Sequence, residues 1–565
     1  MSIYGAMNTA KMALVTQQTA LQITGQNMAN VNNPNFTRQE VLLEAAFPIK
    51  QAGSPGMIGT GVRATAIIRR FDSFLEGQRL ANNSTTGYWD ARQDLLSRME
   101  VTFNETSEFG LNNLFDNFFL GWQELSFNPQ GLTERTNLVG QAQTMTQMFA
   151  KVNQDIKNLR IDLDTKITSS VTEINELSAQ IAKLNEAIHE AETFNVNAND
   201  LRDKRDKLIR DLSEYVDVTS VEGSNKQVMV AIKGGRPLVI DQTVFNLSTT
   251  IRPDDALSSD IYWTDAGGSK TKITNEMTNG QIGAWVEMRD TQFPDVIDKL
   301  DLVAATMIRD INKQHSAGYG LDGSSGTDFF TGLSPESYAD RDNTGTATVS
   351  ASIVAPDNVN LHKFRISYAS SGSTLTIRDL TRGVDVATEA GYSSGANISY
   401  FQDNGMNVAI DTTGISNGDK FVVHAANDAS LNMAVNSSIV SDTDLIAAGE
   451  TTNQGDGSNA LTIAQLQDTN TLNKDTASST GTATFSEFYN SIVGSIGVSS
   501  REANANYNQQ EAINFELDNR REQVSGVSLD EEMINLIKFQ RAYQASSRMI
   551  GVIDELLQTL VALGR

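Results

Sequence analysis

The sequence predicts a multidomain α+β protein whose N- and C-terminal helices form a coiled coil, with a long helical stalk and two inserted β-rich domains. Three patterns support this prediction. Apolar residues recur every seven positions near both chain ends, and a longer apolar series spaced by threes and fours covers residues 138–192. Short stretches of alternating apolar and polar residues occupy residues 216–278 and 346–465. A chain of 565 residues is long enough for several domains.

The composition excludes several classes of function. The chain has no cysteine, which removes disulfides, thiolate metal sites and cysteine nucleophiles, so packing alone must stabilise the fold. Its formal net charge of -25 argues against nucleic acid and anionic membranes as partners, because both favour Lys and Arg. Apolar runs stay short and Thr and Gln interrupt the N-terminal one, so we expect neither a membrane span nor a cleaved secretory signal.

The N-terminal helix is predicted from a seven-residue repeat over residues 3–31. One register comprises Met7, Leu14, Leu21 and Met28, with Ile3, Ala10 and Val31 at the companion positions. Lys11 is the only charge before Phe36, and an outer face of Gln, Asn, Thr and Ala favours protein neighbours over bulk water. The helix should end before Pro34, because the proline ring disfavours a helical conformation at Asn33.

The C-terminal helix is predicted by the same repeat. Ser528 and Glu531 have the spacing of a capping box at its start. The repeat comprises Leu529, Leu536, Tyr543, Ile550 and Leu557, widened by Phe539, Ile553 and Leu560. Residues 1–50 with 523–565 are therefore predicted to form one terminal coiled-coil assembly domain. Its predicted subunit-interface residues are Ile3, Met7, Leu14, Leu21, Met28, Leu536, Phe539, Tyr543, Ile550, Ile553, Leu557 and Leu560.

Two arrangements of these terminal helices fit the repeat. They can form a two-helix hairpin sealed within a monomer, or they can pack against neighbouring subunits. Burying one seam stabilises the N-terminal helix by less than the ordering of its backbone costs, and the charge-poor outer face also requires cover. These considerations favour intermolecular packing.

The stalk is predicted to be built around residues 138–192, a rod about 80 Å long at 1.5 Å per residue. Its helical partners are predicted at residues 88–104, 280–314 and 485–522. Pro294 should kink the second of these. The helical stalk domain is assigned residues 51–215, 279–345 and 466–522.

Two β-rich domains are predicted to be inserted in the stalk. Residues 216–278 form the first, and residues 346–465, rich in Ser, Thr, Gly, Asn and Asp, form an outer variable domain. The stretch from Asp442 to Asp475 is polar and weakly patterned, so we interpret it as a loop that re-enters the stalk.

No catalytic, cofactor or metal site is predicted. The four histidines lie far apart without metal-ligand spacing and are interpreted as surface or turn residues: His189, His315, His362 and His424. The turn at residues 322–328 resembles a calcium loop, but Gly326 occupies the fifth ligand position and the twelfth lacks Glu, which favours a simple turn. Residues 267–270 lack the preceding glycine of a phosphate-binding loop, and no G-x-S-x-G occurs.

A run of alternating charges is the remaining candidate for acid-base chemistry. It comprises Asp200, Arg202, Asp203, Lys204, Arg205, Asp206 and Lys207. Alternating signs on a helix are more typical of a solvated, ion-paired face than of a catalytic site. We therefore predict a solvent-exposed surface here.

Both chain ends resemble the bacterial flagellar axial family of rod, hook and hook-associated proteins. Residues 29–39, A-N-V-N-N-P-N-F-T-R-Q, are similar to that family's N-terminal signature A-N-x-x-T-P-G-[FY], and its turn is assigned here to Asn30, Pro34, Phe36 and Arg38. Asn33 replaces Thr and Asn35 replaces Gly; since Asn tolerates positive φ, the turn should be retained. Residues 540–545 and 554–560 resemble the family's C-terminal helix.

The interior resembles the hook-associated members that join hook to filament. Similar segments are N-D-L-R-D-K-R-D at residues 199–206, residues 311–315, Gly318, residues 321–323, residues 326–330 and residues 418–421. The resemblance covers nearly the whole chain and is weakest in residues 346–410.

The resemblance implies a non-enzymatic structural subunit, secreted unfolded through the flagellar export channel and assembled outside the cell at the distal end of the hook. The implied partners are copies of itself in a ring or helical zone, the hook protein, the second junction protein (hook-associated protein 3) and an export chaperone on the C-terminal helix. No cofactor is implied.

Other functions remain as alternatives. The nearest is another axial protein such as hook or distal rod, which the long rod at residues 138–192 disfavours. Flagellin is disfavoured by the Pro34 turn and by the Q-R-A-Y-Q segment. An adhesin, or an enzyme inserted at residues 346–465, is less well supported, because no motif surrounds the two histidines of that segment.

Overall fold

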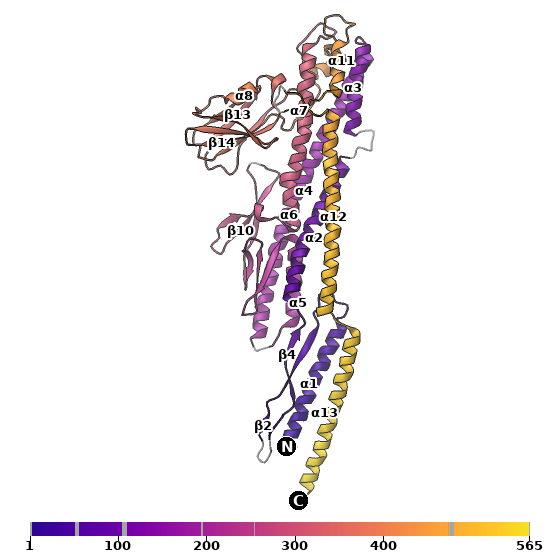
Figure 1. The fold of residues 1–565 in the computed structure, drawn as a ribbon, viewed down its shortest axis with the longest axis vertical. Coiled ribbons are helices and arrows are strands. Elements are labelled where there is room, and N and C mark those ends of the chain that lie inside the picture. The colour runs from indigo at the N-terminus through magenta and orange to yellow at the C-terminus, as the bar shows by residue number, and fades with distance from the viewer. Residues whose placement is uncertain are drawn as a thin grey trace.

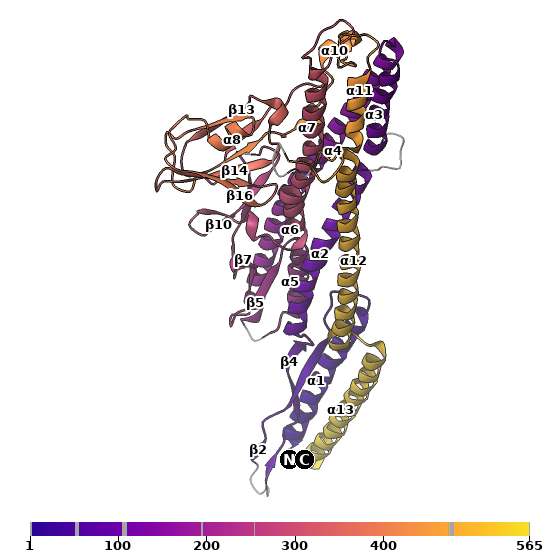
Figure 2. The ribbon, with the colours of Figure 1, turned by 45° about the horizontal axis from the view of Figure 1, so that its top comes forward.

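The computed structural model describes residues 3–50, 56–103, 110–193, 196–253, 255–472, 474 and 479–563. The chain is an elongated α+β molecule with long terminal helices and several antiparallel β-sheets (Figure 1). Both chain ends lie at one extremity, and a bundle of long helices extends away from them (Figures 1 and 2).

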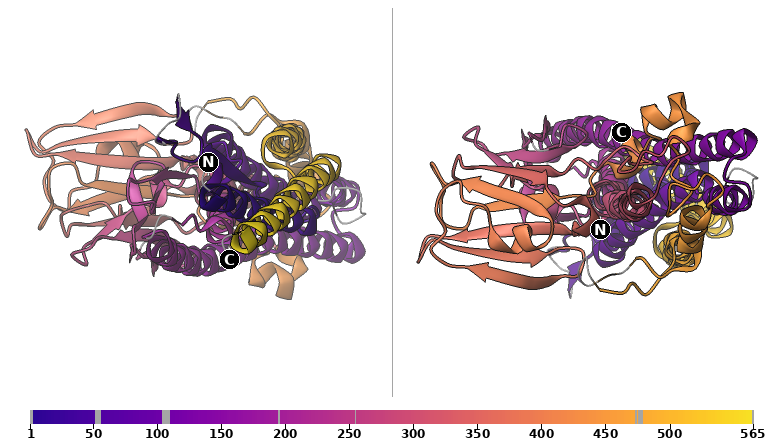
Figure 3. Two further views of the ribbon diagram at one scale, coloured as in Figure 1. Left: turned by 90° about the horizontal axis from the view of Figure 1, so that it is seen from below. Right: turned by 90° about the horizontal axis from the view of Figure 1, so that it is seen from above.

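The extremity that holds both chain ends, which we call the terminal unit, is built on helix α1 (Ile3–Ala29). It also contains α13 (Leu529–Leu563) and a β-hairpin of β1 (Gln39–Ala45), β2 (Ile49–Lys50), β3 (Met57–Ile58) and β4 (Val62–Arg69). The hairpin and α13 pack on opposite sides of α1 (Figures 1 and 3). Strands β3 and β4 lie beyond the predicted domain boundary at residue 50, yet they pair with β2 and β1.

The buried face of α1 consists of small and polar side chains rather than of large apolar ones. Its members are Ala10, Thr16, Ala20, Thr24 and Asn27. The Thr16 hydroxyl donates to the Val62 carbonyl at 3.3 Å, and a Cβ placed on Gly61 would lie 3.0 Å from Thr9 Cγ2. Small residues therefore let the hairpin approach the helix backbone closely.

The stalk is a bundle around α4 (Leu132–Glu192), a single helix of 61 residues. The remaining helices are α2 (Ser73–Thr102), α3 (Leu111–Phe127), α5 (Asn199–Tyr215), α6 (Gly280–Glu287), α7 (Phe293–Ala317) and α12 (Phe485–Ser525). Most apolar residues of α4 that were predicted from their spacing, including Met145, Phe149 and Ile156, are buried in the stalk core, whereas Leu159 and Leu184 are half-buried. At 1.5 Å per residue α4 is about 90 Å long.

The predicted kink at Pro294 coincides with an irregularity of the bundle. A π-helical segment, Met288–Gln292, separates α6 from α7, and Pro294 lies in the first turn of α7. A proline is tolerated in a first turn because its missing N–H has no intrahelical acceptor there.

Two β regions project from the same side of the stalk (Figures 1 and 3). The first has a four-stranded sheet of β5 (Val218–Glu222), β6 (Val228–Ile232), β7 (Arg236–Ile240) and β8 (Thr243–Val244), and a three-stranded sheet of β9 (Leu247–Ile251), β10 (Ser259–Thr264) and β11 (Lys270–Lys272). These strands lie where the sequence predicted alternation.

The outer β region has a five-stranded sheet in the order β12-β18-β14-β15-β16 and a separate pair, β13 with β17. Its strands are β12 (Glu336–Ala339), β13 (Thr348–Ile353), β14 (Lys363–Ala369), β15 (Thr374–Asp379), β16 (Val384–Glu389), β17 (Met406–Asp411) and β18 (Lys420–His424), with helix α8 (Ser399–Asp403) before β17. Single 3-10 turns occur at Thr274–Glu276, Pro356–Asn358, Thr443–Leu445 and Leu466–Asp468.

The chain returns to the stalk through α9 (Ala429–Asn432), α10 (Ser437–Ser441) and α11 (Ser458–Gln465). The interpretation of residues 442–475 as a loop is therefore wrong for α11, which packs against α3 and α7. Its short apolar pattern, with Ala460 and Ile463 buried, was too brief to be recognised by periodicity.

The interpretation of the histidines as surface or turn residues is wrong for three of the four. His315, His362 and His424 are buried, whereas His189 is exposed. His315 is enclosed by the aromatic core, where its Nδ1 lies 2.6 Å from the Thr327 carbonyl and its Nε2 accepts from the Ala447 N–H at 2.9 Å. Two backbone partners satisfy a neutral imidazole without water.

Candidate assembly site between the terminal helices and the stalk

The family-signature turn follows the end of α1. The Phe36 N–H donates to the Asn33 carbonyl at 3.1 Å, and the Asn35 N–H donates to the Asn33 side chain at 3.1 Å. Asn at the first position and Pro34 at the second are typical of a turn that requires no positive φ. The expectation that Asn35 is tolerated through positive φ is therefore wrong, because Asn35 is not among the described residues with positive φ, although the turn itself is retained.

Just after the turn, side chains of α1 hold the first strand. Asn27 Nδ2 donates to the Gln39 carbonyl at 2.9 Å, and its Oδ1 accepts from the Gln39 N–H at 3.1 Å. The side-chain amide of Asn27 thus forms with Gln39 the pair of hydrogen bonds that the backbone of a neighbouring strand would otherwise form. Phe36 and Thr37 are buried between this contact and the stalk. The turn is accordingly a packed element and not a free loop.

The carboxylates of α5 bind the segment that leaves the turn. The Thr37 N–H donates to Asp203 at 2.9 Å, and Gln39 Nε2 donates to Asp200 at 2.8 Å. Arg69, at the end of the hairpin, pairs with Asp203 at 2.6 Å and with Asp206 at 2.8 Å. Both strands of the hairpin are therefore anchored on one helix of the stalk.

The prediction of a solvated face at residues 200–207 is wrong for its central members. Asp203 and Arg205 are buried, and Asp206 is largely covered. The buried charges are paired, as predicted, but Asp203 and Arg205 pair with Arg69 and Glu222 on other elements, whereas the exposed Lys207 pairs with Asp211 on the same helix. Alternation along one helix cannot reveal that a second, distant segment covers the charged face.

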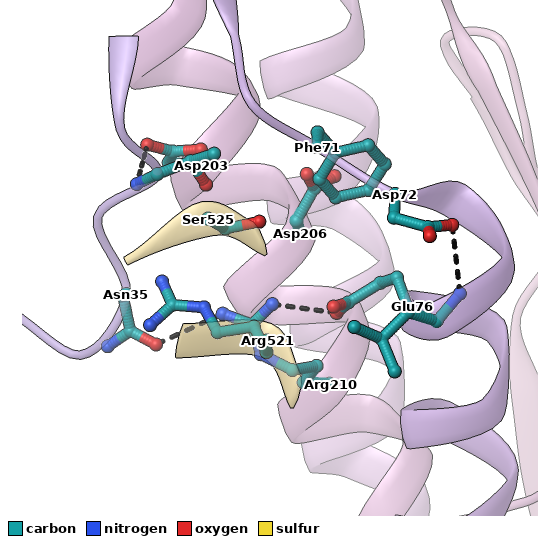
Figure 4. A pocket seen from close by; sticks show the side chains of 11 residues that line it. Asn35, Phe71, Asp72, Glu76, Asp203, Asp206, Arg210, Arg521 and Ser525 are labelled. Atoms are coloured by element: carbon teal, nitrogen blue, oxygen red, sulfur yellow. Dashed lines mark hydrogen bonds and ion pairs between the residues drawn. The ribbon is translucent and has the colours of Figure 1, made fainter. Parts of the chain in front are cut away.

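A second set of contacts joins the turn to α2 and α12. Arg210 bridges Glu76 at 2.7 Å and the Asn35 side chain at 3.0 Å (Figure 4). Arg521 of α12 donates to the Phe36 carbonyl. The cavity that these residues line holds only about 20 Å³, room for about one water molecule. Its size fits a packed joint rather than a substrate pocket.

Arg38 connects the turn to the C-terminal helix. Its guanidinium pairs with Glu531 at 2.7 Å and Glu532 at 2.8 Å, and its N–H donates to the Ser525 carbonyl at 2.9 Å. Burial lowers the pKa of Arg38, but the two carboxylates outweigh burial and raise it overall. Of the predicted capping box, the Glu531 N–H donates to the Ser528 hydroxyl at 3.5 Å, the upper limit for a hydrogen bond. The Glu531 carboxylate pairs with Arg38.

The same balance of charges operates at Arg69. Burial disfavours its guanidinium, yet the carboxylates of Asp206 and Asp203 raise its pKa. Arg69 therefore remains charged and requires both carboxylates, since a buried unpaired charge is costly. We call these contacts around Asn35, Arg38, Arg69 and Asp203 the joint.

The predicted interface residues lie along two helices that pack together within one chain. Ile553 is buried, and Met7 and Leu560 are exposed. The half-buried members are Ile3, Leu14, Leu21, Met28, Leu536, Phe539, Tyr543, Ile550 and Leu557. In a single chain most of the predicted seam is thus partly covered by the other terminal helix. Of the signature residues, Phe36 is buried, Asn30 and Arg38 are half-buried and Pro34 is exposed.

A further apolar surface was not predicted as part of the interface. Along α13 it comprises Ile534, Ile537, Met549, Val552 and Leu556, which join the predicted Leu560. Each of these six side chains is 45–66 % exposed. Ile534 and Ile537 are three residues apart, and the last four residues of the set are spaced by threes and fours. This spacing was the signal that could have revealed a second stripe on this helix.

The remaining candidate sites have simple structural roles. Asp322 accepts from the Ser324 N–H and hydroxyl within its own turn, and the charged run at residues 200–207 belongs to the joint. No cluster of His, Asp and Glu suited to a metal ion occurs among the described residues. Across the same described ranges, no helix combines the length and the apolar character needed to span a membrane.

Family models match two segments of this chain, and curated relatives align with nearly all of it. Residues 96–330 match the family described as flagellar hook-associated protein FlgK helical domain, and residues 521–563 match flagellar basal body rod FlgEFG protein C-terminal. The flagellar hook-associated protein 1 of Bacillus subtilis is 26% identical over 99% of this chain and 98% of its own length, and that of Salmonella typhimurium is 26% identical over 98% and 99%. The flagellar hook junction protein FlgK of Burkholderia pseudomallei shares the fold, with a TM-score of 0.69 and 20% identity over 80% of this chain and 100% of its own.

Proposed function

We propose that this chain, which belongs to the flagellar hook-associated protein 1 family, is a structural subunit of the junction between the flagellar hook and filament. Its terminal unit assembles with neighbouring subunits, and its stalk and β regions project from that assembly. The main support for this proposal is the exposed apolar stripe of α13. The stripe belongs to the terminal unit, which the ion pairs of the joint connect to the stalk.

The joint gives the terminal unit its mechanical role. Arg38 connects the turn to α13, Arg69 connects the hairpin to α5, and Arg210 of α5 connects the turn to the stalk through the Asn35 side chain. A subunit placed between a flexible hook and a stiff filament has to transmit force from its assembly surface to its body. Buried ion pairs resist bending there, because separating one leaves a charge without a partner.

The assembly surface combines the predicted interface residues with the outer stripe of α13. We propose that Ile3, Met7, Leu14, Leu21 and Met28 of α1 and their counterparts in α13 hold the two helices together and contact adjacent subunits where they remain exposed. Large apolar residues in a solvent-exposed row are typical of a surface that is covered in an assembly.

The proposed partners are further copies of this chain, the hook protein on one side and hook-associated protein 3 on the other. An export chaperone that covers the C-terminal helix before assembly is part of the same proposal, as is a secreted, extracellular location. We propose no catalytic activity, no nucleic acid partner and no membrane partner.

Deleting residues 1–36 tests the proposed function. The stalk core is built from other elements, so its helices and sheets should remain folded, whereas the variant should no longer add to the tips of isolated hooks. Circular dichroism checks the fold, and electron microscopy of hooks incubated with each protein checks assembly. Hooks that are still capped by the truncated protein would contradict the proposal.

A further inference from the structure

Two apolar surfaces of the terminal unit have no cover within the chain. One is the end of the β-hairpin, where Phe47, Ile49 and Met57 are 53–77 % exposed. The other is the outer stripe of α13, from Ile534 to Leu560. Helix α1 separates the hairpin from α13 (Figures 1 and 3), so the hairpin end and the stripe lie on opposite flanks of the unit.

The two surfaces lie at matching heights below the joint. The ion pair between Arg38 and Glu532 at 2.8 Å places the starts of β1 and α13 side by side, and both elements run from there toward the chain ends (Figure 1). At about 3.3 Å per strand residue, Phe47 and Ile49 lie about 26 Å and 33 Å along the hairpin. At 1.5 Å per helical residue, the segment from Met549 to Leu556 lies about 30 Å to 41 Å along α13.

The charges along the two surfaces follow a complementary order. On the hairpin, Glu44 and Lys50 lie at about 17 Å and 36 Å, and Glu44 pairs with Arg63 of the same hairpin at 3.5 Å. On α13, Arg541 precedes Glu555 at about 18 Å and 39 Å. Lys50, Arg541 and Glu555 form no ion pair within the described parts of the chain. Placed side by side in the same direction, the hairpin and the helix bring Lys50 opposite Glu555, whereas Glu44 at the upper height already has Arg63 of its own hairpin as a partner.

We propose that the hairpin end of one copy packs on the outer stripe of α13 in the next copy. This inference rests on the proposed function and specifies which surfaces meet between subunits. Because the two surfaces differ and lie on opposite flanks, each copy uses one surface on each side, and the contact repeats into a ring or a helical zone. A second copy is favoured over an unrelated partner because the heights and the charge order match within this one chain.

Disulfide trapping tests the contact directly, because the natural chain contains no cysteine. Ile49→Cys and Val552→Cys are introduced together in the full chain, at heights of about 33 Å and 35 Å. The matched control combines Ile49→Cys with Gly551→Cys, one residue away on α13 and turned by about 100° from the stripe. Gly551 has open space around it, so its substitution does not disturb packing.

Each protein is added to isolated hooks, the capped hooks are counted by electron microscopy, and the bound protein is oxidised and run on a non-reducing gel. We expect both pairs to cap hooks, the first pair to shift from monomer to a ladder of linked copies, and the control to remain monomeric. Capping without a ladder, or equal ladders from both pairs, would overturn the contact and leave the proposed function intact. Failure of the natural chain to cap hooks would overturn both.

Charge exchange gives an independent readout that does not depend on cysteine geometry. Lys50→Glu and Glu555→Lys should each reduce the number of capped hooks, because each places like charges opposite one another, and the double variant should restore capping. If the double variant shows the summed loss of the two single variants, Lys50 and Glu555 do not meet and the proposed alignment is wrong.

Discussion

At the scale of single residues, the joint depends on a few buried charges that satisfy backbone groups as well as each other. Asp203 accepts from the Thr37 N–H and pairs with Arg69, so one carboxylate fixes both the turn and the hairpin. Neither partner is close to Asp203 in the sequence. This is why the charge pattern alone suggested a solvated surface.

Replacing Asp203 with Ala should loosen the joint locally. The change leaves Arg69 with Asp206 alone and the Thr37 N–H without its acceptor, at a cost of roughly 3 kcal/mol. Hydrogen-deuterium exchange of residues 30–39 should therefore accelerate while exchange in the stalk core stays unchanged. Asp211→Ala is the control, because its exposed pair with Lys207 contributes less than about 1 kcal/mol. Equal effects of the two changes would contradict the role given to Asp203.

His315 should make stability depend on pH. Burial lowers its pKa from 6.5 to about 4, so the folded state resists protonation that the unfolded state accepts. The stabilising contribution is complete above about pH 6.5 and is lost as the pH falls toward about 4. Asp301, whose pKa burial raises to about 7, changes stability in the opposite direction over part of this range.

The contribution of His315 is therefore measured by difference. We expect acidification from about pH 7 to about pH 5 to destabilise the natural chain by more than it destabilises His315→Gln, by an amount on the order of 2 kcal/mol. Urea unfolding followed by tryptophan fluorescence, to which Trp122 with its ring 6.0 Å from that of His315 contributes, provides the measurement. An identical pH dependence in both proteins would show that His315 does not titrate as described.

At the scale of elements, sequence periodicity predicted the long helices. It did not predict the elements whose formation depends on contacts with distant parts of the chain. The repeats placed α1, α4 and α13, because their apolar rows are long enough to define a helix face. The hairpin at residues 39–69 was not recognised, since its stability comes from Asn27 and from α5 rather than from an apolar pattern of its own. The capping box at the start of α12 was also not recognised, although Thr484 and Glu487 have the required spacing.

Thr484→Ala should destabilise the start of α12. The Thr484 side chain accepts from the Glu487 N–H at 3.2 Å, and the Glu487 carboxylate accepts from the Thr484 N–H at 3.0 Å. Losing such a cap costs about 1 kcal/mol. Thermal unfolding should therefore begin a few degrees lower than in the natural chain, whereas Thr168→Ala, on the exposed face of α4, should have little effect or stabilise slightly.

At the scale of the whole molecule, charge is distributed unevenly. Residues 1–72 with 526–565 contain ten Lys and Arg and eight Asp and Glu, although the complete chain has a net charge of -25. The terminal unit is thus almost balanced, and the stalk and β regions carry the acidic excess. Neighbouring copies that join through their terminal units bring acidic stalks together.

Assembly should therefore strengthen with ionic strength at low salt. Repulsion between the stalks is long-ranged and is screened over about 10 Å at 0.1 M salt, whereas the apolar contacts between terminal units are insensitive to screening. Cosedimentation with hooks in low and in moderate salt measures the effect. Weaker binding in moderate salt would indicate that attraction between charges, rather than apolar contact, dominates the interface.

The pairing of α1 with α13 also has a consequence for timing. These helices stand at opposite ends of the polypeptide yet complete each other, so the unit closes only when the whole molecule is present. A partly delivered or broken chain lacks one half of this closure, whatever the state of its middle. A fragment that lacks either helix therefore leaves the face of the other helix without its cover.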